Sequence, residues 1–248
     1  MRFEIEGVFL LGCGHGIIPE SDIVGGVGVS NTTKIRVYHF LNADYGIQNI
    51  EKRRIKISTL LGVNDPFELL GANVSNRGVR DLFTLVKREF DKEYGMLCFS
   101  KSNHSPVQWA HYGDRHTGVC LGFDVSADLL KDVHYVETRP DDFIFPVDPE
   151  GEMLWGERLL YTKYSHWSYE EEARAFVSLD KEEDGRYFKY FDDTVSLAEV
   201  LVGFNSNLSR AKVYQALGDI KNNVEVYKVR PAFQSFKMVR NLDDSQWK

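Results

Sequence analysis

The chain has 248 residues, of which 43% are hydrophobic and 13% aromatic, so it can fold around a full core. Thirty lysines and arginines stand against 37 aspartates and glutamates, which gives a net charge of −7. An excess of acidic residues excludes a protein that binds polyanions through its overall charge. Any contact with nucleic acid must be made by a local group of basic residues.

Three cysteines at wide spacing, Cys13, Cys98 and Cys120, argue against a disulfide framework and against a CxxC zinc site. No stretch approaches the roughly 18 apolar residues that cross a bilayer. We therefore expect a cytoplasmic protein with no membrane partner. Cys98 and Cys120 lie in apolar strand patterns, where thiols are usually inert core residues.

The chain is expected to form one domain of residues 34–248, preceded by a glycine-rich extension of residues 1–33 that packs on it. The glycines of the extension do not have the spacing of a phosphate-binding loop. From residue 34 onward, short elements alternate. In chain order the apolar patterns predict a strand at 35–40, a helix at 42–54, a strand at 55–59, a loop at 62–68, a helix at 77–94, a strand at 96–100, a short helix at 105–112, strands at 118–125 and 133–138, a loop at 141–152, strands at 175–177, 187–191 and 199–204, a helix at 208–220 and strands between 224 and 239.

Many short strands with helices grouped early indicate an α+β fold rather than a doubly wound parallel sheet. Within it, four clusters combine histidine, aromatic and acidic residues, at 38–40, 64–68, 109–116 and 167–174. Polar groups flanked by aromatic rings are typical of sites that orient a ring-bearing ligand. His111 and His116 are five residues apart, which does not place two ligands on one helix face, so no metal is expected.

The last cluster contains Glu170, Glu172 and Arg174 at alternating positions. On a strand these side chains share one face, so two carboxylates and a guanidinium would converge. Such a carboxylate pair can have pKa values that are pushed apart, with the arginine keeping one member ionised. The alternative is a solvated acidic run with one surface salt bridge.

Two other candidates have structural alternatives of similar weight. His39 stands in an otherwise apolar strand, where it is either a core histidine bonded to the backbone or a ligand-contacting residue. Asn64, Asp65 and Pro66 form a turn by themselves, with Phe67 as its anchor, or contribute to a site.

These clusters together resemble a bacterial family described as a domain of unknown function (number 2971), which also occurs on mobile elements. The resemblance spans roughly residues 36–230 and leaves the first 33 residues outside. Its motifs lie at residues 37–40, 64–68, 96–100, 109–113, 116–123, 167–174 and 200–203.

More distantly, the sequence is similar to ADP-ribosyltransferases of the His-Tyr-Glu kind, through a first strand bearing Tyr38 and His39 and a late glutamate at the mouth of a strand. The resemblance implies NAD as substrate, held in a split, mostly antiparallel sheet of an α+β domain. It implies that His39 binds the NAD ribose, that Tyr112 or Phe67 stacks on nicotinamide, and that Glu172 is catalytic.

The same resemblance implies wider sets of site residues. The catalytic candidates are Glu172, Glu170 and Glu199, since Glu199 also precedes a strand and is similar to the catalytic motif of some members. The candidates for binding NAD are Tyr38, His39, Asn64, Asp65, Phe67, Trp109, His111, Tyr112, His116 and Arg174. The acceptor would be a protein or nucleic acid, and the family association suggests a toxin or anti-phage defence effector with an antitoxin or defence-system partner.

Two rival hypotheses use the same residues. The first is a non-catalytic module that binds a nucleotide or a nucleic-acid end. The second is a hydrolase or nuclease in which Asp65, Glu68, Glu170 and Glu172 hold Mg²⁺, since oxygen ligands suit this ion. The transferase hypothesis requires the side chains of His39, Phe67, Trp109, Tyr112 and Glu172 to converge.

Overall fold

The computed structural model describes residues 33–68, 71–139, 158–243, 245 and 247. Most of the predicted glycine-rich extension, with Cys13, and the predicted loop at 141–152 lie outside these residues. In chain order the elements are β1 (Lys34–Leu41), α1 (Ala43–Glu51), β2 (Arg54–Ile57), α2 (Arg77–Glu93), β3 (Tyr94–Ser100), α3 (Pro106–His111), β4 (Val119–Ser126), η2 (Ala127–Leu129), β5 (Lys131–Asp132), β6 (His134–Val136), β7 (Thr162–Tyr164), η3 (Ser165–Glu170), β8 (Glu172–Ser178), β9 (Glu182–Glu183), β10 (Arg186–Tyr190), β11 (Val195–Val202), α5 (Arg210–Leu217), η4 (Gly218–Asn222), β12 (Glu225–Pro231) and β13 (Met238–Arg240).

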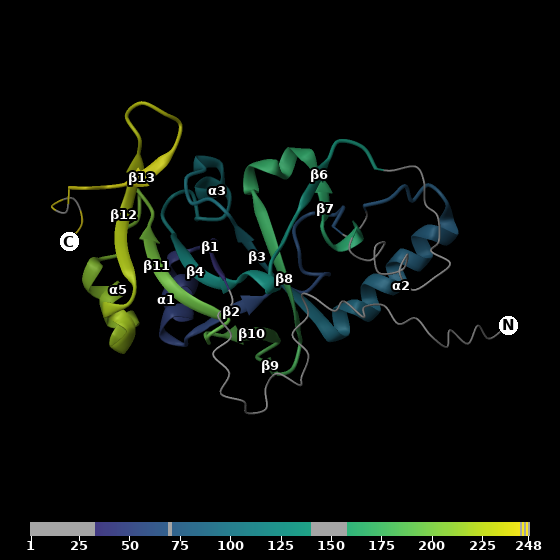
Figure 1. The fold of residues 1–248 in the computed structure, drawn as a ribbon, viewed down its shortest axis with the longest axis horizontal. Coiled ribbons are helices and arrows are strands. Elements are labelled where there is room, and N and C mark those ends of the chain that lie inside the picture. The colour runs from purple at the N-terminus through teal and green to yellow at the C-terminus, as the bar shows by residue number, and fades with distance from the viewer. Residues whose placement is uncertain (1–32, 69–70, 140–157, 244, 246, 248) are drawn as a thin grey trace.

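The centre of the fold is an eight-stranded sheet in the order β13-β12-β11-β4-β1-β3-β8-β5 (Figure 1). All neighbours in it are antiparallel except β11 and β12, which run parallel. A three-stranded sheet, β2-β10-β9, and a parallel pair, β6-β7, accompany it. The expected α+β fold with a mostly antiparallel sheet is confirmed.

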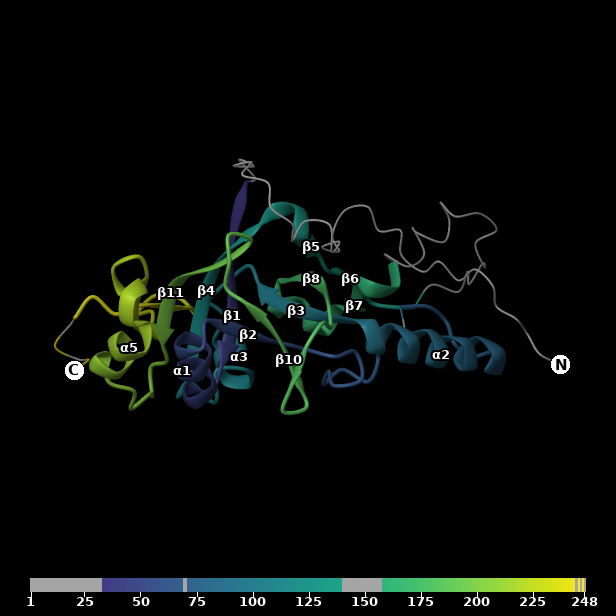
Figure 2. The ribbon, with the colours of Figure 1, turned by 90° about the horizontal axis from the view of Figure 1, so that it is seen from below.

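One face of the main sheet carries the largest hydrophobic core. Val37 of β1, Leu121 of β4 and Val200 of β11 point into it and are fully excluded from solvent. Helices α1 and α5 lie next to each other there (Figures 1 and 2), and their residues Ile50 and Val213 belong to the same core. This face is therefore built for packing.

Arg53 explains why α1 ends earlier than its apolar pattern predicts. This residue has φ 51°, in the left-handed region, which turns the chain after Glu51 and directs it into β2. The Arg53 guanidinium then donates to the carbonyl oxygens of Ala216 at 3.1 Å and Leu217 at 2.6 Å. It thereby caps the C-terminal end of α5 and connects the two helices.

The opposite face of the sheet is covered by the short helix α3 and, over β3 and β8, by α2, whose Phe90 ring lies 5.6 Å from that of Phe176. Trp109 of α3 is completely buried against Phe40 in an edge-to-face contact at 5.2 Å, and Cys120 and Leu201 complete this second cluster. Ser105 caps α3 by accepting from the Gln108 amide. Of the helices that the structure describes, none is long and apolar enough to span a membrane.

Strand register decides which polar residues share this second face. Glu199, Gly122, Tyr38, Ser100 and Glu172 are successive partners across β11, β4, β1, β3 and β8. Residues paired in register point to the same side of a sheet, so these five form one row. His39 follows Tyr38 on β1 and therefore points to the opposite face, where its ring lies 6.2 Å from Phe99 of the large core.

Gly118, just before β4, is a point where two backbones approach closely. A Cβ atom there would lie 2.1 Å from the Leu41 carbonyl oxygen and 2.9 Å from that of Gly113. We expect Gly118→Ala to lower the free energy of unfolding by about 1–3 kcal/mol, measured by urea denaturation. The control is Gly78→Ala in α2, where only the Asn76 side chain is near and alanine favours the helix. Equal midpoints for the two variants would contradict this packing.

Candidate functional site

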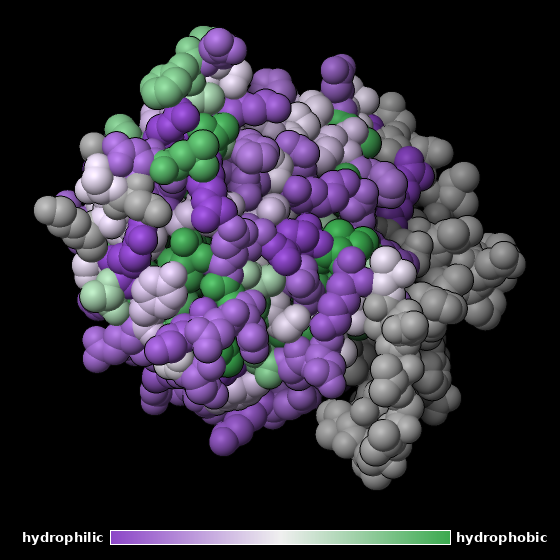
Figure 3. Space-filling view, turned by 60° about the vertical axis from the view of Figure 1, so that its left-hand side comes forward, coloured by the Kyte–Doolittle hydropathy of each residue, from purple (hydrophilic) through white to green (hydrophobic). Residues whose placement is uncertain are grey.

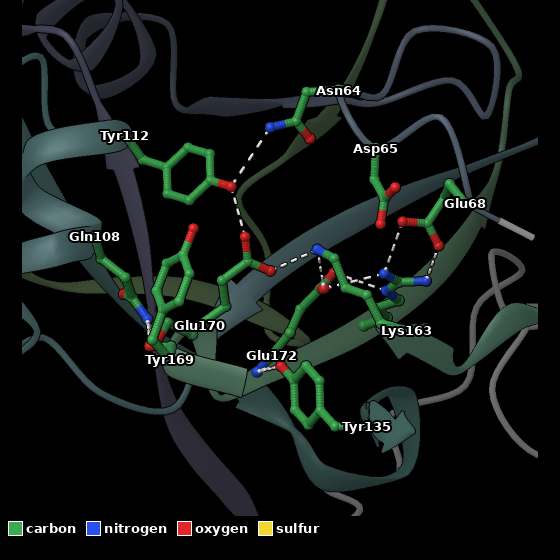
Figure 4. Close-up of polar contacts among 12 residues, drawn as sticks. Asn64, Asp65, Glu68, Gln108, Tyr112, Tyr135, Lys163, Tyr169, Glu170 and Glu172 are labelled. Atoms are coloured by element: carbon green, nitrogen blue, oxygen red, sulfur yellow. Dashed lines mark hydrogen bonds and ion pairs between the residues drawn. The ribbon is translucent and has the colours of Figure 1, made fainter. Parts of the chain in front are cut away.

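The polar residues on the second face gather around β8, in what we call the carboxylate cluster: Glu68, Lys163, Glu170, Glu172 and Arg174. Figure 4 shows Glu68, Lys163, Glu170 and Glu172 converging from the loop after β2, from β7, from η3 and from β8. Arg174 of β8 forms ion pairs with Glu68 and Glu172 among them. All five are buried. Three carboxylates and two cations thus share one region that is nearly closed to solvent.

Arg174 holds two of the carboxylates. Its Nε and Nη2 atoms lie 2.7 and 3.0 Å from the two oxygens of Glu172, and its Nη1 and Nη2 atoms lie 2.6 and 3.1 Å from those of Glu68. The Leu160 carbonyl oxygen accepts a further bond from Nη1 at 2.7 Å. Arg174 is 0% exposed, so both bidentate pairs are fully withdrawn from water.

Glu68 reaches Arg174 because of the turn at 64–68. The Asp65 carboxylate accepts the Phe67 amide at 2.9 Å, and the Glu68 amide donates to the Asp65 carbonyl oxygen at 3.1 Å. This is the turn that the Asn-Asp-Pro sequence predicts, and Asp65 and Glu68 are both buried in it. The turn is structural, and it also delivers a carboxylate to the cluster.

Lys163 joins the second pair of carboxylates, Glu170 and Glu172. Its ammonium contacts Glu170 and lies 3.0 Å from Glu172, with the Trp167 ring at 5.1 Å. The sequence analysis does not predict Lys163 as a site residue, because nothing in the pattern around β7 distinguishes it from a surface lysine.

Tyr135 is not predicted either. Its hydroxyl accepts a hydrogen bond from the Glu172 amide at 2.9 Å.

Glu170 and Glu172 converge, but not by strand alternation. Glu170 ends η3, Glu171 has φ 45° in the left-handed region, and β8 begins only at Glu172. The predicted strand geometry for residue 170 is therefore wrong, although the proximity of Glu170, Glu172 and Arg174 is confirmed. The left-handed residue turns the chain so that both carboxylates reach Lys163.

The two neighbouring glutamates have pKa values shifted in opposite directions. Burial raises the pKa of Glu170. The charge of Lys163 and the hydrogen bonds of Lys163 and Tyr112 lower it, but by less than burial raises it. Burial would also raise the pKa of Glu172, but the charges and hydrogen bonds of Arg174 and Lys163 lower it to about 2. Folding therefore favours the ionised form of Glu172 and the protonated form of Glu170, so Glu170 is the carboxylate of the pair that more readily exchanges a proton.

A short polar path leads outward from Glu170. The Tyr112 hydroxyl donates to Glu170 Oε1 at 2.5 Å and accepts from Asn64 Nδ2 at 3.4 Å (Figure 4). Burial and the Glu170 carboxylate raise the pKa of Tyr112, so the phenol stays protonated. Beside it, His111 contacts the Tyr169 hydroxyl at 3.0 Å. Tyr112 and Asn64 thus connect the proton-exchanging carboxylate with the surface.

Lys163 also lines a pocket of about 270 Å³. Phe67, Arg139, Thr162 and Tyr164 are among the other lining residues. Phe67 is 54% exposed and its ring lies 4.7 Å from the Arg139 guanidinium. The pocket therefore combines aromatic walls with cationic groups next to the carboxylate cluster.

Several predicted residues lie outside this site. Trp109 is a core residue whose indole donates to the Asn103 carbonyl oxygen at 2.8 Å. His116 has φ 67°, and its carbonyl oxygen accepts the Asn205 amide. His39 donates from Nδ1 to the Cys98 carbonyl oxygen at 3.0 Å, and burial lowers its pKa. Because His39 and Glu172 point to opposite faces, the expected convergence of these two residues is wrong, and the core-histidine alternative describes His39.

Glu199 forms a separate polar group on the same face as Glu172. Its carboxylate contacts the Arg36 guanidinium and accepts from the Tyr227 hydroxyl at 3.2 Å. Arg36 also binds Asp124 through two bonds of 2.7 and 3.1 Å. Tyr38, whose pKa is raised by burial and by Glu199, stands between this group and the carboxylate cluster. The two late glutamates therefore belong to two different environments.

The arrangement of charges argues against Mg²⁺ as the partner of Asp65, Glu68, Glu170 and Glu172. Arg174 and Lys163 already lie between the three glutamates, so a divalent cation there would face two buried positive charges. Within the described ranges, no group of three or more His, Cys, Asp or Glu side chains is placed to hold a metal. Burial raises the pKa of Cys98 and of Cys120, which keeps both thiols protonated.

Comparison with family models shows which family part of the chain is similar to. Residues 108–175 match the model of a family described as "Protein of unknown function (DUF2971)". The resemblance to this family is confirmed. The matched segment contains the last four residues of α3, Tyr112, Lys163 and the Glu170–Arg174 part of the carboxylate cluster. No curated protein and no solved structure matched the chain.

Removal of Arg174 tests whether the cluster depends on it. Arg174→Ala leaves Glu68 and Glu172 buried without their main partner, so we expect the free energy of unfolding to fall by about 3–5 kcal/mol in urea denaturation. The matched control is Arg77→Ala in α2, where the arginine is 86% exposed and 3.7 Å from Asp81, and stability should not change measurably. Equal stability of both variants would contradict the cluster.

Acid should destabilise the protein through Glu172. Its pKa is lowered from 4.5 to about 2 by folding, so its contribution is complete above pH 4.5 and is lost as the pH falls toward 2. The loss amounts to about 3 kcal/mol, measured as the free energy of unfolding against pH. Glu172→Gln should have a shallower acid dependence, whereas Glu170→Gln should keep it. The same slope in the wild type and Glu172→Gln would disprove the assignment.

Proposed function

We propose that the protein is an ADP-ribosyltransferase-like enzyme that uses NAD and that Glu170 is its reacting carboxylate. One observation carries the proposal. Two adjacent buried carboxylates have pKa values shifted in opposite directions, and the member with the raised pKa is the one connected to the surface through Tyr112. This division between a fixed anion and a proton-exchanging carboxylate is typical of acid–base pairs in active sites.

The residue types suit the cleavage of a nicotinamide N-glycosidic bond. This reaction develops positive charge on the ribose, which an ionised Glu170 would stabilise. The Tyr112, Tyr169 and Trp167 side chains near Glu170 would limit access of water to the cation. Glu172 keeps Lys163 and Arg174 in place and touches no reacting atom, because both cations already occupy its two oxygens.

This proposal differs from the transferase hypothesis that the sequence suggests. The hypothesis that required His39 and Glu172 to converge fails, because the two side chains lie on opposite faces of the sheet. The present proposal keeps only NAD as the substrate, makes Glu170 the reacting group and gives His39 no role in binding the ribose. Phe67, beside the pocket at Lys163, is the ring that could stack on nicotinamide. The fold is proposed to be ADP-ribosyltransferase-like on the basis of its mostly antiparallel sheet alone.

The wider setting follows from the family resemblance. We extend the proposal to a cytoplasmic toxin or anti-phage effector that modifies a macromolecule and is controlled by an antitoxin or another member of its defence system. A non-catalytic nucleotide-binding module would use the same rings, but it would have no use for a carboxylate whose pKa is raised.

Nicotinamide release from NAD tests the proposal. Glu170→Gln preserves shape but removes the negative charge, so turnover should fall by about 10²–10³ while NAD binding, measured by calorimetry, persists. Glu199→Gln is the matched control, because Glu199 lies on the same face in a different polar group. Its turnover should equal that of the wild type.

A pH profile separates a reacting carboxylate from a structural one. If the ionised form of Glu170 is required, kcat should rise as the pH rises through its raised pKa, and this rise should disappear in Glu170→Gln. No nicotinamide release by the wild type with a fractionated cell lysate as acceptor would contradict the proposal. Full release by Glu170→Gln would remove Glu170 from the site, and loss of release only in Glu199→Gln would move the reaction to the second polar group.

A further inference from the structure

The hairpin of β12 and β13 carries two aromatic side chains that the fold does not bury. Phe233 is 88% exposed and Phe236 is 97% exposed, both in the connection between the two strands. This connection projects from the edge of the main sheet (Figure 1), and a space-filling view turned toward that edge shows apolar side chains on the projection among hydrophilic ones (Figure 3). Exposed rings at a rigid position indicate a binding surface.

The hairpin is positively charged, whereas the whole chain is negatively charged. Residues 228–240 contain Lys228, Arg230, Lys237 and Arg240 and no acidic residue, whereas the chain has a net charge of −7. Lys228 donates to the Ser206 carbonyl oxygen and Arg240 pairs with Glu225, so these two are partly engaged. Arg230 and Lys237 are the cations next to the rings.

The rings are held by an ordered frame. The Ala232 amide donates to the Lys237 carbonyl oxygen at 2.8 Å, which closes the hairpin. Met238 is buried. Its amide donates to the His104 carbonyl oxygen, and His104 Nδ1 donates to the Met238 carbonyl oxygen, each at 2.8 Å. The Arg230 guanidinium lies 4.1 Å from the centre of the Phe233 ring. A partner would therefore meet preformed rings and not a collapsed loop.

We propose that this hairpin binds single-stranded nucleic acid, with bases stacked on Phe233 and Phe236 and phosphates near Arg230 and Lys237. Aromatic rings interleaved with basic residues are how proteins bind unpaired bases without sequence preference. Charge complementarity is local here, as the acidic balance of the chain requires. The proposal stands independently of the transferase chemistry at Glu170.

An anionic membrane is the other partner that basic and aromatic residues could meet, and the tip of the hairpin disfavours it. Gln234 and Ser235 lie between the two phenylalanines, at the point that would enter the lipid first. Insertion would bury their polar side chains and backbone groups without partners. Bases stacked on the two rings leave these groups in water.

Fluorescence anisotropy with a labelled thymidylate oligonucleotide of about 15 nucleotides tests the proposal on the full chain. We expect binding at low salt that weakens as salt is raised, because phosphate contacts release counterions. The double variant Phe233→Ala/Phe236→Ala should weaken binding at least tenfold. Lys237→Glu should weaken binding and reduce its dependence on salt.

Leu242→Ala is the matched control, because Leu242 is 81% exposed and lies just beyond β13 without a place in the hairpin. Its affinity should stay within twofold of the wild type. The removed rings are exposed, so thermal unfolding should be unchanged in every variant. The proposal is overturned if the wild type does not bind the oligonucleotide, if the double variant binds as well as the wild type, or if the hairpin variants lose binding only to phosphatidylserine vesicles.

Discussion

Arg174 places a permanent positive charge inside the protein, and a guanidinium there is tolerated only if all of its surroundings are arranged for it. Glu172 comes from the same strand, Glu68 from a loop more than 100 residues earlier, and the Leu160 carbonyl oxygen from the segment before β7. Each partner fixes a different part of the chain. The turn at 64–68, β7 and the start of β8 are therefore positioned by one buried cation.

The same electrostatics locate the chemistry. With all groups ionised, the carboxylate cluster would hold three negative and two positive charges, and the excess of one negative charge is costly in a buried region. Glu68 and Glu172 are bound by Arg174, so the excess falls on Glu170, whose pKa is raised by burial. Protonation of Glu170 relieves this excess, which agrees with the direction of its pKa shift. The site thus prepares an acid–base group as a consequence of how its structural ion pairs are distributed.

The sequence predicts much of the fold, because the elements with clear apolar periodicity are found where expected, from β1 to the long helix α2. It also predicts that Glu170, Glu172 and Arg174 lie together. It could not predict the left-handed turn at Glu171, nor Lys163, because each depends on contacts with distant segments. The resemblance to ADP-ribosyltransferases places His39 in the site. Successive side chains of a strand point to opposite faces, however, and in the assembled sheet Tyr38 lies on the face of Glu172 and His39 on the other. Side-chain parity is set by pairing register, which only the assembled sheet reveals.

The hairpin of β12 and β13 and the carboxylate cluster are connected through the segment around α3. The buried contacts of Met238 with His104 attach the hairpin to the loop that precedes α3, and α3 ends next to Tyr112, which donates to Glu170 of the carboxylate cluster. The same short helix therefore links the hairpin, through His104, with the Tyr112 hydroxyl that donates to Glu170. Because Trp109 fixes this helix in the core, a strand of nucleic acid on the hairpin would be held at a constant offset from Glu170.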